Sequence, residues 1–545
     1  MRRSLRSLAE KSYDLLIIGG GINGAGIASE AAGRGLKPLL LERRDFSSGT
    51  TSRSTKLIHG GLRYLEHGEF GLVFESLRER EALLQRAPHL VRPLPFLILL
   101  HRDGPYRPFR VRLGLTVYDL LSLGKSVPSH RALTIAEVRE REPALVVEGV
   151  KAAFLYFDAQ VPYPERLVLE NVRAAEARGA DVLNYAEVIG LILEAGVVCG
   201  ARVRDRVSGE EGVVRARVVV NAAGPWVDAV CRFLPRAIPR QIGGTKGSHL
   251  VAPNRWGLRH ALYAAAHMDG RPFFIVPWHG HVLIGTTDIR YEGDADQVQA
   301  DDEEVAYLLA EARRLLGPEL RRHEVLYAYS GVRPLPYQPG VPEGAITRRH
   351  IIRDHERADG LAGFISIIGG KITPYRHLAE EVVTLVCRKL RIEQRALTKS
   401  RCEPLPGGAP VVPRDVEEAA RALGLTSDTV AHLLALYGSL SWEVLELVER
   451  ERTLAERLCP HHPDIAAQIV YAVEREHAVH LADIFLRRTA IGWGRCLGLA
   501  CAATAARYLG WDAHRAQEEI TAYRDELARM FRVFAPPLGE SVPSS

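Results

Sequence analysis

Residues 13–42, YDLLIIGGGINGAGIASEAAGRGLKPLLLE, contain the pattern that decides the fold. A continuous apolar run leads into a glycine-rich turn, then into small residues at helical spacing, and then into a second apolar run that ends in an acid. This order predicts a strand, a tight turn, a helix and a second strand parallel to the first. Both runs are apolar throughout, which is typical of a parallel sheet that is buried on both faces.

The glycine-rich turn has the features of a dinucleotide site. Gly19, Gly21 and Gly24 fit the pattern G-x-G-x-x-G. These glycines permit the tight turn, the approach of backbone to a pyrophosphate, and close packing of helix on strand. Glu42 ends the next strand, where it would accept hydrogen bonds from the ribose diol of an adenosine without a 2′-phosphate. A purely structural glycine turn is the alternative, but this context favours the nucleotide site.

Two later stretches favour FAD over NAD. Residues 215–226, RARVVVNAAGPW, fit a strand that returns to the same sheet beside the adenosine. Residues 364–383, FISIIGGKITPYRHLAEEVV, fit a strand, a glycine pair and a helix whose N-terminus could face the electron-rich edge of a flavin. Cofactor-binding segments that lie before and after a substrate domain in the sequence suit FAD better than NAD. Besides the glycine turn and Glu42, we predict cofactor contacts from Ile22, Asn23, Val188, Ala223, Gly224, Trp226, Gly370, Lys371, Ile372 and Thr373.

Composition bounds the class of protein. The chain has 545 residues with 47% hydrophobic content, which is enough for more than one domain. A net charge of +5 does not suggest a nucleic-acid binder. The seven cysteines lack metal-ligand spacing, so we expect reduced thiols and no metal site. No apolar run is long enough to span a membrane. Residues 89–115 are the best candidate for a peripheral membrane contact, and a buried strand with a solvated loop is the alternative.

The chain also divides by pattern. Residues 396–412 are rich in proline and glycine and predict a linker. Before it, residues 1–395 would form a FAD-binding domain with an interleaved substrate-binding domain. After it, residues 413–545 fit helices only, and we derive no role for them from their sequence.

Eight segments, taken together, resemble one family. In chain order they are DLLIIGGGINGAGIA, STKLIHGGLRYLE, VVNAAGPW, KGSH, IGTTD, YSGVRPL, AITR and GGKITPYR. The set is similar to the FAD-dependent glycerol-3-phosphate dehydrogenases, and LPGG at 405–408 is similar to the start of that family's C-terminal helical domain. Ile372 and Pro374 replace residues that are commonly Leu and Thr in the family, but neither supplies chemistry. The match is less clear over residues 89–150.

The resemblance implies an α/β fold. It implies a Rossmann-like FAD-binding domain of the glycine-oxidase-like type, a substrate domain built on an antiparallel sheet, and a C-terminal all-helical domain. The implied reaction is oxidation of sn-glycerol 3-phosphate to dihydroxyacetone phosphate by hydride transfer from C2 to FAD, with electrons passed to a membrane quinone. We therefore expect a cytoplasmic protein held peripherally at the inner face of the cell membrane, with a homodimer as a further expectation.

The segment STKLIHGGLRYLE, residues 54–66, is predicted to divide its work between cofactor and substrate. It follows the ribose-binding strand, so it starts near the cofactor. Glycine at 60 and 61 would let backbone approach the flavin, where a side chain would collide. We predict that the cofactor is bound by Ser54, Thr55, Lys56, His59, Gly60 and Gly61, and the substrate by Arg63 and Tyr64.

Three further residues are predicted to perform the chemistry. A phosphate is best held by arginine forks, and the resemblance assigns this role to Arg333 and Arg348. The alternative for each arginine is a structural ion pair. His249 is the favoured general base for the hydroxyl proton and would also contact the substrate, with His59 as a competitor. Lys371 is placed in the cavity near the flavin. We take His249, Lys371 and Arg333 as the catalytic set.

Two other functions remain open at this level. The first is an oxidase with the same site, which would pass electrons to oxygen and produce hydrogen peroxide. The second is a non-catalytic flavin- or nucleotide-binding protein whose helical domain binds a partner. The combination of arginine, histidine and lysine argues against the second.

Overall fold

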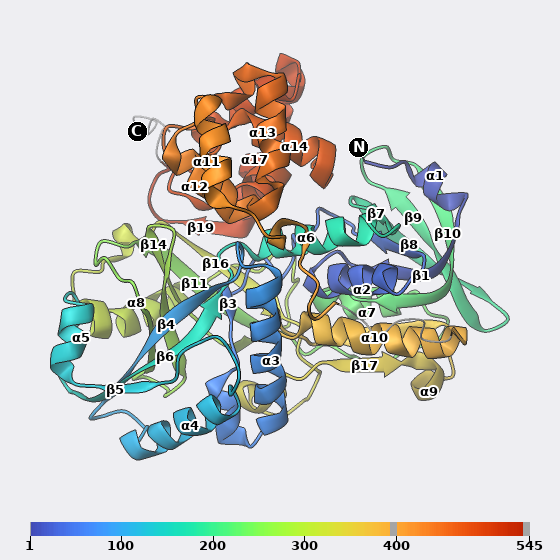
Figure 1. Ribbon diagram of the computed structural model, residues 1–545. Helices are drawn as coiled ribbons and strands as arrows, with labels where there is room; N and C mark the ends of the chain where they lie inside the picture. Colours follow the sequence, from blue (N-terminus) through green and yellow to red (C-terminus); the bar gives the residue numbers. More distant parts are fainter. Residues whose placement is uncertain (1, 393–399, 538–545) are drawn as a thin grey trace.

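The computed structural model describes residues 2–392 and 400–537, and it contains two sheets side by side beneath a group of helices (Figure 1). The first sheet has the order β17-β18-β10-β1-β2-β7. Strands β1 (Ser12–Ile18) and β2 (Pro38–Leu41) are parallel and are joined by α2 (Ile22–Gly33), so the predicted βαβ unit is confirmed.

Both of the later stretches contribute strands to this sheet, and the return of the first was predicted. Strand β10 (Glu211–Asn221) lies parallel to β1, and β18 (Phe364–Ile368) lies parallel to β10. The remaining strands are β7 (Asp181–Leu183), β8 (Ala186–Glu194), β9 (Val197–Asp205) and β17 (Ile351–Asp354). Because parallel strands end at one edge, the glycine turn, residue 222 and the glycine pair at 369–370 are brought together there.

Helices bury one face of this sheet. Their apolar sides share a core with β1, β2 and β10. These helices are α2, α6 (Pro164–Glu176) and α10 (Tyr375–Leu390). The opposite face is covered by α1 (Leu5–Ala9), α7 (Val227–Cys231) and the β8–β9 hairpin.

The second sheet carries the other wall of the site. It has 11 strands and the order β19-β16-β11-β14-β13-β12-β4-β6-β3, with β5 and β15 at its sides. Its pairs are antiparallel except for β12 with β4, which is parallel. The strands are β3 (Leu57–Ile58), β4 (Arg92–His101), β5 (Arg131–Leu133), β6 (Val150–Gln160), β11 (Thr245–Pro253), β12 (Ala261–Ala265), β13 (Pro272–Trp278), β14 (His281–Gly285), β15 (Ile289–Arg290), β16 (Tyr327–Arg333) and β19 (Phe531–Val533).

Four helices lie around the second sheet. They are α3 (Phe70–Arg86), α4 (Pro108–Leu120), α5 (Ile135–Arg141) and α8 (Asp302–Leu316). The segment 89–115 contains the buried strand of the second reading, β4, followed by a surface helix, α4, and its contact with a membrane remains a prediction. Among residues 2–392 and 400–537, no helix is both long and apolar enough to cross a membrane.

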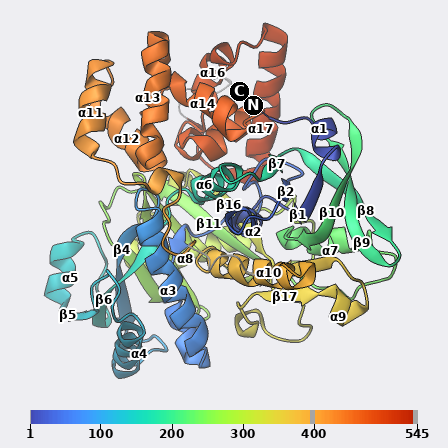
Figure 2. The same ribbon diagram turned by 45° about the vertical axis from the view of Figure 1, so that its right-hand side comes forward.

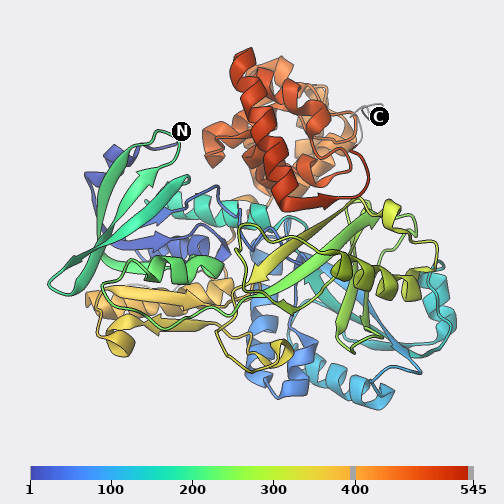
Figure 3. The same ribbon diagram turned by 180° about the vertical axis from the view of Figure 1, so that it is seen from behind.

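The C-terminal region is helical, as predicted. Its helices are α11 (Pro413–Ala422), α12 (Ser427–Tyr437), α13 (Ser441–Arg450), α14 (Ala466–Glu476), α15 (Leu481–Asp483), α16 (Ala502–Tyr508) and α17 (Ala513–Met530). The sequence pattern did not predict that α17 would run into a strand, β19, which pairs with β16 of the second sheet (Figure 3). The helices and this sheet share one hydrophobic core. The region is therefore built onto the substrate side of the protein.

The structure describes only part of the predicted linker. Residues 396–399 are outside the described residues. Its later part is packed rather than loose, because the Gly407 N–H donates to Glu170 of α6 at 2.7 Å and the Leu405 N–H donates to the carbonyl of Arg86. The exact domain boundaries remain a prediction.

A buried carboxylate ties the C-terminal helices to the loop after Glu42. Asp45 is fully buried and accepts hydrogen bonds from Arg487 at 2.6 Å and from Arg488 at 2.8 Å. Asn184 donates to the same carboxylate at 3.0 Å. Because these groups are withdrawn from water, each depends on the others to satisfy its charge.

We expect Asp45→Ala to lower the free energy of unfolding by about 3–5 kcal/mol, because it leaves buried Arg488 without its paired carboxylate and Arg487 with Asp483 alone. Urea denaturation, followed by the circular dichroism of the protein, measures the change. Glu418→Ala is the matched control, since Glu418 pairs with Arg414 on the exposed face of α11 and should change stability by less than about 1 kcal/mol. Equal effects of the two substitutions would contradict the assignment.

Candidate active site

One cavity of about 750 Å³ runs between the two sheets, from the glycine turn to β11 and β16. All predicted cofactor and substrate residues contribute to its lining except Gly24, Lys56 and Gly60. The residues predicted from separate motifs therefore meet at a single site. Its volume falls in the range of ligand cavities, which is roughly 300–1,000 Å³.

Close backbone contacts explain the glycines of the turn. A Cβ on Gly24 would lie 1.8 Å from the carbonyl oxygen of Gly19, and one on Gly19 would lie 2.7 Å from the carbonyl oxygen of Ala222. Gly19 also has a φ of +109°. These contacts bear out the predicted close packing of helix on strand, which places the N-terminus of α2 at the cavity.

Glu42 stabilises the turn from the neighbouring strand. Its carboxylate accepts hydrogen bonds from the backbone N–H of Gly20 at 2.7 Å and of Arg44 at 2.8 Å. Burial raises the pKa of Glu42, although these two hydrogen bonds oppose the rise. Glu42 lines the cavity, and its carboxylate oxygens can accept further hydrogen bonds, which suits the predicted contact with a ribose diol.

Two predicted cofactor residues need correction. The ammonium of Lys56 points away from the cavity, because it donates to the carbonyl of Ser52 at 2.8 Å and pairs with Glu165 at 3.0 Å in the core. Gly60 does not line the cavity either. A Cβ there would collide with Leu77 and with the hydroxyl of Tyr118, so this glycine is required by the packing of α3 and α4.

The glycine pair before α10 lies beside the glycine turn on the same wall of the cavity. Gly370 has a φ of +101°, and a Cβ there would lie 2.7 Å from the side-chain nitrogen of Asn23. The ammonium of Lys371 lies 3.7 Å from the centre of the Tyr64 ring. Burial lowers the pKa of Lys371. Thr373 accepts a hydrogen bond from the His59 N–H at 3.1 Å, which joins this wall to the segment 54–66.

The two predicted phosphate ligands come together at the other end of the cavity. Arg333 and Arg348 both bind Asp288, at 3.1 and 2.7 Å. Burial raises the pKa of Asp288, but the two guanidiniums outweigh it and hold that pKa below its ordinary value. Arg271 also lines the cavity and donates to the carbonyl of Asp288 at 2.7 Å. Arg271 is also paired with Asp269 at 3.0 Å, so the two guanidiniums that share the Asp288 carboxylate leave this end with a surplus of positive charge.

His249 lies on β11 between the cofactor turn and these arginines. Its side chain is 2% exposed, and its Nε2 lies 2.9 Å from the hydroxyl of Thr55. The ring of Tyr329 stacks on it at 4.9 Å, with an angle of 14° between the planes. Burial, aided by the charges of Arg333 and Lys56, lowers the pKa of His249 to about 3. The imidazole is thus neutral at physiological pH.

Sequence reasoning did not assign three residues of this site. Asp288 was visible in GTTD after a strand, but its role as the shared partner of two arginines depends on the fold. Arg271 stands directly before a hairpin strand and carried no motif. Tyr329 is the first residue of the YSGVRPL segment and contacts His249 only because β16 pairs with β11.

Comparisons with known proteins agree with this geometry. Residues 14–375 match the family described as FAD dependent oxidoreductase, and residues 398–516 match the C-terminal domain of alpha-glycerophosphate oxidase. A glycerol-3-phosphate dehydrogenase of Synechocystis sp. is 44% identical over 96% of this chain and 98% of its own length. The chain belongs to the family of FAD-dependent glycerol-3-phosphate dehydrogenases.

Two further relatives define the family's breadth. The structure of the glycerol-3-phosphate dehydrogenase from Bacillus halodurans, complexed with FAD, has a TM-score of 0.77 at 30% identity, with 98% of each chain covered. The D-erythritol 1-phosphate dehydrogenase of Brucella abortus is 38% identical over 88% of this chain and 94% of its own length. The predicted family, fold class and FAD cofactor are confirmed.

The residues present fit FAD. Several buried polar atoms that line the cavity have no hydrogen-bond partner among the described residues. They are Asn23 Oδ1, Arg53 Nε, Trp226 Nε1, His249 Nδ1 and Lys371 Nζ. Buried polar groups in folded proteins almost always have partners, so these atoms mark where a polar ligand binds. Asn23 and the N-terminus of α2 would hold the pyrophosphate, and Glu42 the adenosine ribose.

We expect Glu42→Ala to weaken FAD binding by at least about 10-fold, because it removes both the ribose acceptor and the anchor of the Gly20 N–H. Fluorescence titration of the apoprotein with FAD measures the dissociation constant. Glu194→Ala is the control, since Glu194 pairs with Arg215 on the surface hairpin. Unchanged FAD affinity in Glu42→Ala would contradict this role.

Proposed function

We propose that the protein oxidises sn-glycerol 3-phosphate to dihydroxyacetone phosphate and passes the electrons to a membrane quinone. The observation that carries this proposal is the positively charged end of the cavity, where Arg333, Arg348 and Arg271 surround Asp288 beside His249. Such an end suits a phosphate dianion, because guanidinium forks bind its oxygens in pairs. The predicted substrate contacts Arg63 and Tyr64 lie on the same cavity, as does Lys371, which was predicted beside the flavin.

Substrate binding would neutralise the surplus positive charge at this end of the cavity. Asp288 holds the arginines in place before the phosphate arrives. The phosphate dianion would then balance the surplus positive charge that the single carboxylate leaves. This keeps the arginine forks ordered and aimed at the cavity.

His249 would remove the hydroxyl proton. If its Nε2–H donates to the Thr55 hydroxyl, its Nδ1 carries a free lone pair, and Nδ1 has no partner among the described residues. Bound FAD supplies the acceptor for the hydride that leaves C2. His249 would thereby hold the proton while the arginines fix the phosphate, which orients the C2–H bond in the cavity.

We expect the kcat/KM for glycerol 3-phosphate to fall on the acid side with a midpoint below pH 6.5. A histidine with its ordinary pKa of about 6.5 would lose the basic form there, whereas the lowered pKa of His249 keeps it neutral to lower pH. The remaining limb, near pH 6, would belong to the second ionisation of the substrate phosphate. Steady-state rates across pH 5–9 measure it.

His249→Gln is the companion variant. It should retain FAD and lower the rate of flavin reduction by about 10²- to 10⁴-fold, the usual contribution of a general base. His59→Gln is the matched control for the competing histidine on the same cavity. A larger loss in His59→Gln than in His249→Gln would reverse the assignment.

We expect Arg348→Ala to raise the KM for glycerol 3-phosphate roughly 10- to 100-fold, since a charged hydrogen bond is worth about 1.5–3 kcal/mol and Asp288 would then face the phosphate. FAD content should not change. Arg349→Ala, at the exposed neighbouring position, is the control. A lost flavin with an unchanged KM would place Arg348 at the cofactor instead.

An exposed apolar surface supports the membrane part of the proposal. On α4 and the turn after it, Phe109 is 76% exposed and Leu123 is 75% exposed. Further exposed apolar side chains beside them are Phe70, Phe74, Leu113 and Leu120. We call these six residues the apolar patch. Figures 1 and 2 show α4 and the lower end of α3 at the edge farthest from the C-terminal helices.

Charge around the apolar patch suits an anionic lipid surface. Arg107, Arg110 and Arg112 are exposed at the same helix. Basic residues near a bilayer gain about 1 kcal/mol each from anionic headgroups, and apolar side chains gain by entering the interface. Helix α4 also contacts the turn that carries Arg63 and Tyr64, so a bilayer here would bring a quinone close to the cavity. The homodimer remains a prediction.

We expect the double variant Phe109→Glu, Leu113→Glu to bind anionic phospholipid vesicles at least about 10-fold more weakly, because two side chains lose their burial and gain like charge. Vesicle co-sedimentation measures binding, and added salt should weaken it further. Val412→Glu, 58% exposed beside α11, is the control. Equal binding by both variants would rule out the patch as the contact.

A single preparation tests the function as a whole. The yellow holoprotein should bleach without oxygen when glycerol 3-phosphate is added. Absence of bleaching would exclude the proposal and favour a non-catalytic flavin protein. D-Erythritol 1-phosphate, the substrate in the name of the Brucella relative, should be compared as a competitor. Faster reduction of a quinone analogue than of oxygen would favour the dehydrogenase, and a stoichiometric peroxide yield in air would favour the oxidase.

A further inference from the structure

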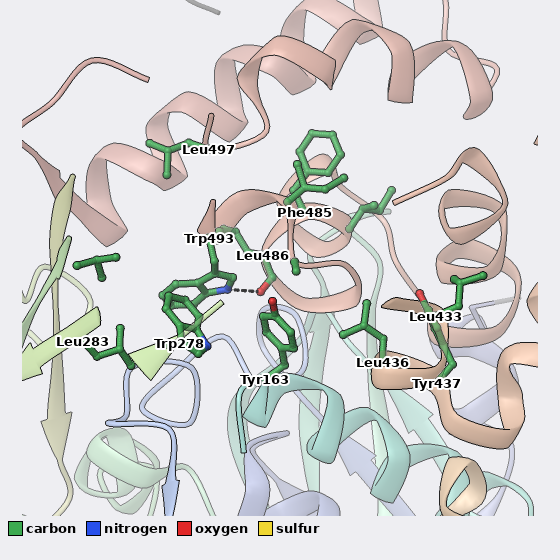
Figure 4. Close-up of a cluster of buried hydrophobic side chains, with 14 of the residues drawn as sticks. Tyr163, Trp278, Leu283, Leu433, Leu436, Tyr437, Phe485, Leu486, Trp493 and Leu497 are labelled. Atoms are coloured by element: carbon green, nitrogen blue, oxygen red, sulfur yellow. Dashed lines mark hydrogen bonds between the residues drawn. The ribbon is translucent and has the colours of Figure 1, made fainter. Parts of the chain in front are cut away.

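The C-terminal helices contribute one large side chain to the layer directly behind the active site. Trp493 lies in the turn Ile491–Trp493 and is 2% exposed. Its indole N–H donates to the carbonyl of Leu486 at 2.9 Å, and its ring meets Trp278 of the second sheet edge-on at 5.6 Å (Figure 4). These contacts fix the plane of the indole.

The face of this indole holds a buried charge. The ammonium of Lys56 lies 4.0 Å from the centre of the Trp493 ring, and its anionic partner is Glu165 at 3.0 Å. Both charged side chains are almost completely buried. A desolvated ammonium gains substantially from an aromatic face, so Trp493 helps to keep Lys56 in the core. Lys56 in turn donates to the carbonyl of Ser52 and fixes the segment 52–56.

The same indole supports the residue that stacks on the proposed base. Tyr329 meets Trp493 edge-to-face, with ring centres 5.5 Å apart. The ring of Tyr329 also stacks on the ring of His249. The hydroxyl of Tyr329 donates to the carbonyl of Ser54 at 2.8 Å. Tyr329 therefore connects Trp493 both to His249 and to the residue before Thr55.

These contacts form a closed ring of residues. One arm runs from Trp493 through Lys56 to the segment 52–56, and the other runs through Tyr329 to His249. The arms meet at the hydrogen bond between Thr55 and His249. We infer that Trp493 is a positioning residue of the active site, which holds Thr55 and His249 together through Lys56 and Tyr329. The inference rests on the proposed function of His249.

This gives the C-terminal region a part in the reaction. Trp493 does not line the cavity, so it cannot touch substrate or FAD. Its effect would pass through the orientation of His249, and a small displacement of a general base lowers the rate strongly. Substrate affinity depends on arginines at another part of the wall, so it should change little.

The test compares Trp493→Leu, Trp493→Phe and the control Trp442→Leu, which changes a 38% exposed tryptophan of α13. Stopped-flow reduction of the holoenzyme by glycerol 3-phosphate without oxygen gives the limiting rate and the substrate dependence. We expect Trp493→Leu to keep its FAD, to lose about 10-fold or more in limiting rate, and to keep its KM within about 2-fold. Trp493→Phe should remain within about 3-fold of the unaltered protein, because it offers an aromatic face to Lys56 and Tyr329.

Several outcomes would overturn the inference. One is a limiting rate for Trp493→Leu equal to that of Trp442→Leu. Others are a phenylalanine variant as impaired as the leucine variant, or a KM that rises in step with the lost rate. If Trp493→Leu does not fold, Tyr329→Phe decides, since it removes only the hydroxyl that binds Ser54. A lowered limiting rate with an unchanged KM would support the ring, and an unaltered rate would overturn it.

Failure of this inference can be told apart from failure of the proposed function. If the unaltered protein does not bleach with glycerol 3-phosphate, the proposed substrate is wrong. If His249→Gln matches the control rate, the proposed base is wrong. If the unaltered protein bleaches and His249→Gln is impaired, but Trp493→Leu matches the control, only the role of Trp493 is wrong.

Discussion

The approach of α2 to the end of β1 is the constraint on which the rest of this structure depends. Gly24 lies against the carbonyl of Gly19 with no space for a side chain, and Gly19 lies as closely against the end of β10. This packing fixes where the N-terminus of α2 opens. The edge formed by β1, β2, β10 and β18 then becomes one wall of the cavity, and the second sheet supplies the other. A larger residue at either glycine would push these elements apart and disrupt the site.

Charge is arranged along the cavity in a way that suits its two ligands. At the proposed cofactor end, the N-terminus of α2 and the carboxylate of Glu42 border the cavity together with Arg43, Arg44 and Arg53. At the proposed substrate end, Arg333 and Arg348 share the carboxylate of Asp288, and Arg271 donates to its backbone carbonyl. His249 stands between the two ends and is kept neutral mainly by burial. A neutral imidazole is in the form that accepts a proton, and a bound phosphate dianion would offset the positive charges that lower its pKa.

The C-terminal helices belong to this arrangement. They meet the FAD-binding loop through Asp45 with Arg487 and Arg488, and they meet the substrate sheet through β19 and Trp493. The region touches both halves of the cavity wall from behind. It therefore holds the two sheets in position relative to each other, and its hydrophobic core is continuous with that of the second sheet.

Local pattern was sufficient for the βαβ unit and for the strands that join its sheet. The glycine turn, Glu42 and the strands at 215–221 and 364–368 were predictable, because strand periodicity and turn chemistry are encoded over a few neighbouring residues. The motifs around Arg333, Arg348 and His249 identified residues that do meet in one cavity. Pattern did not reveal the direction of a side chain, and Lys56 was therefore assigned to the cavity although its ammonium lies in the core.

What the sequence by itself determined is the nucleotide-binding unit, the order of the elements and the chemical types available to the site. What only the tertiary structure decided is which of those residues face one another. The pairing of Asp288 with two arginines, the ring from Trp493 to His249 and the return of β19 join residues far apart in the chain. Such contacts depend on the packing of whole sheets and helices, so their physical cause is absent from any single stretch of sequence.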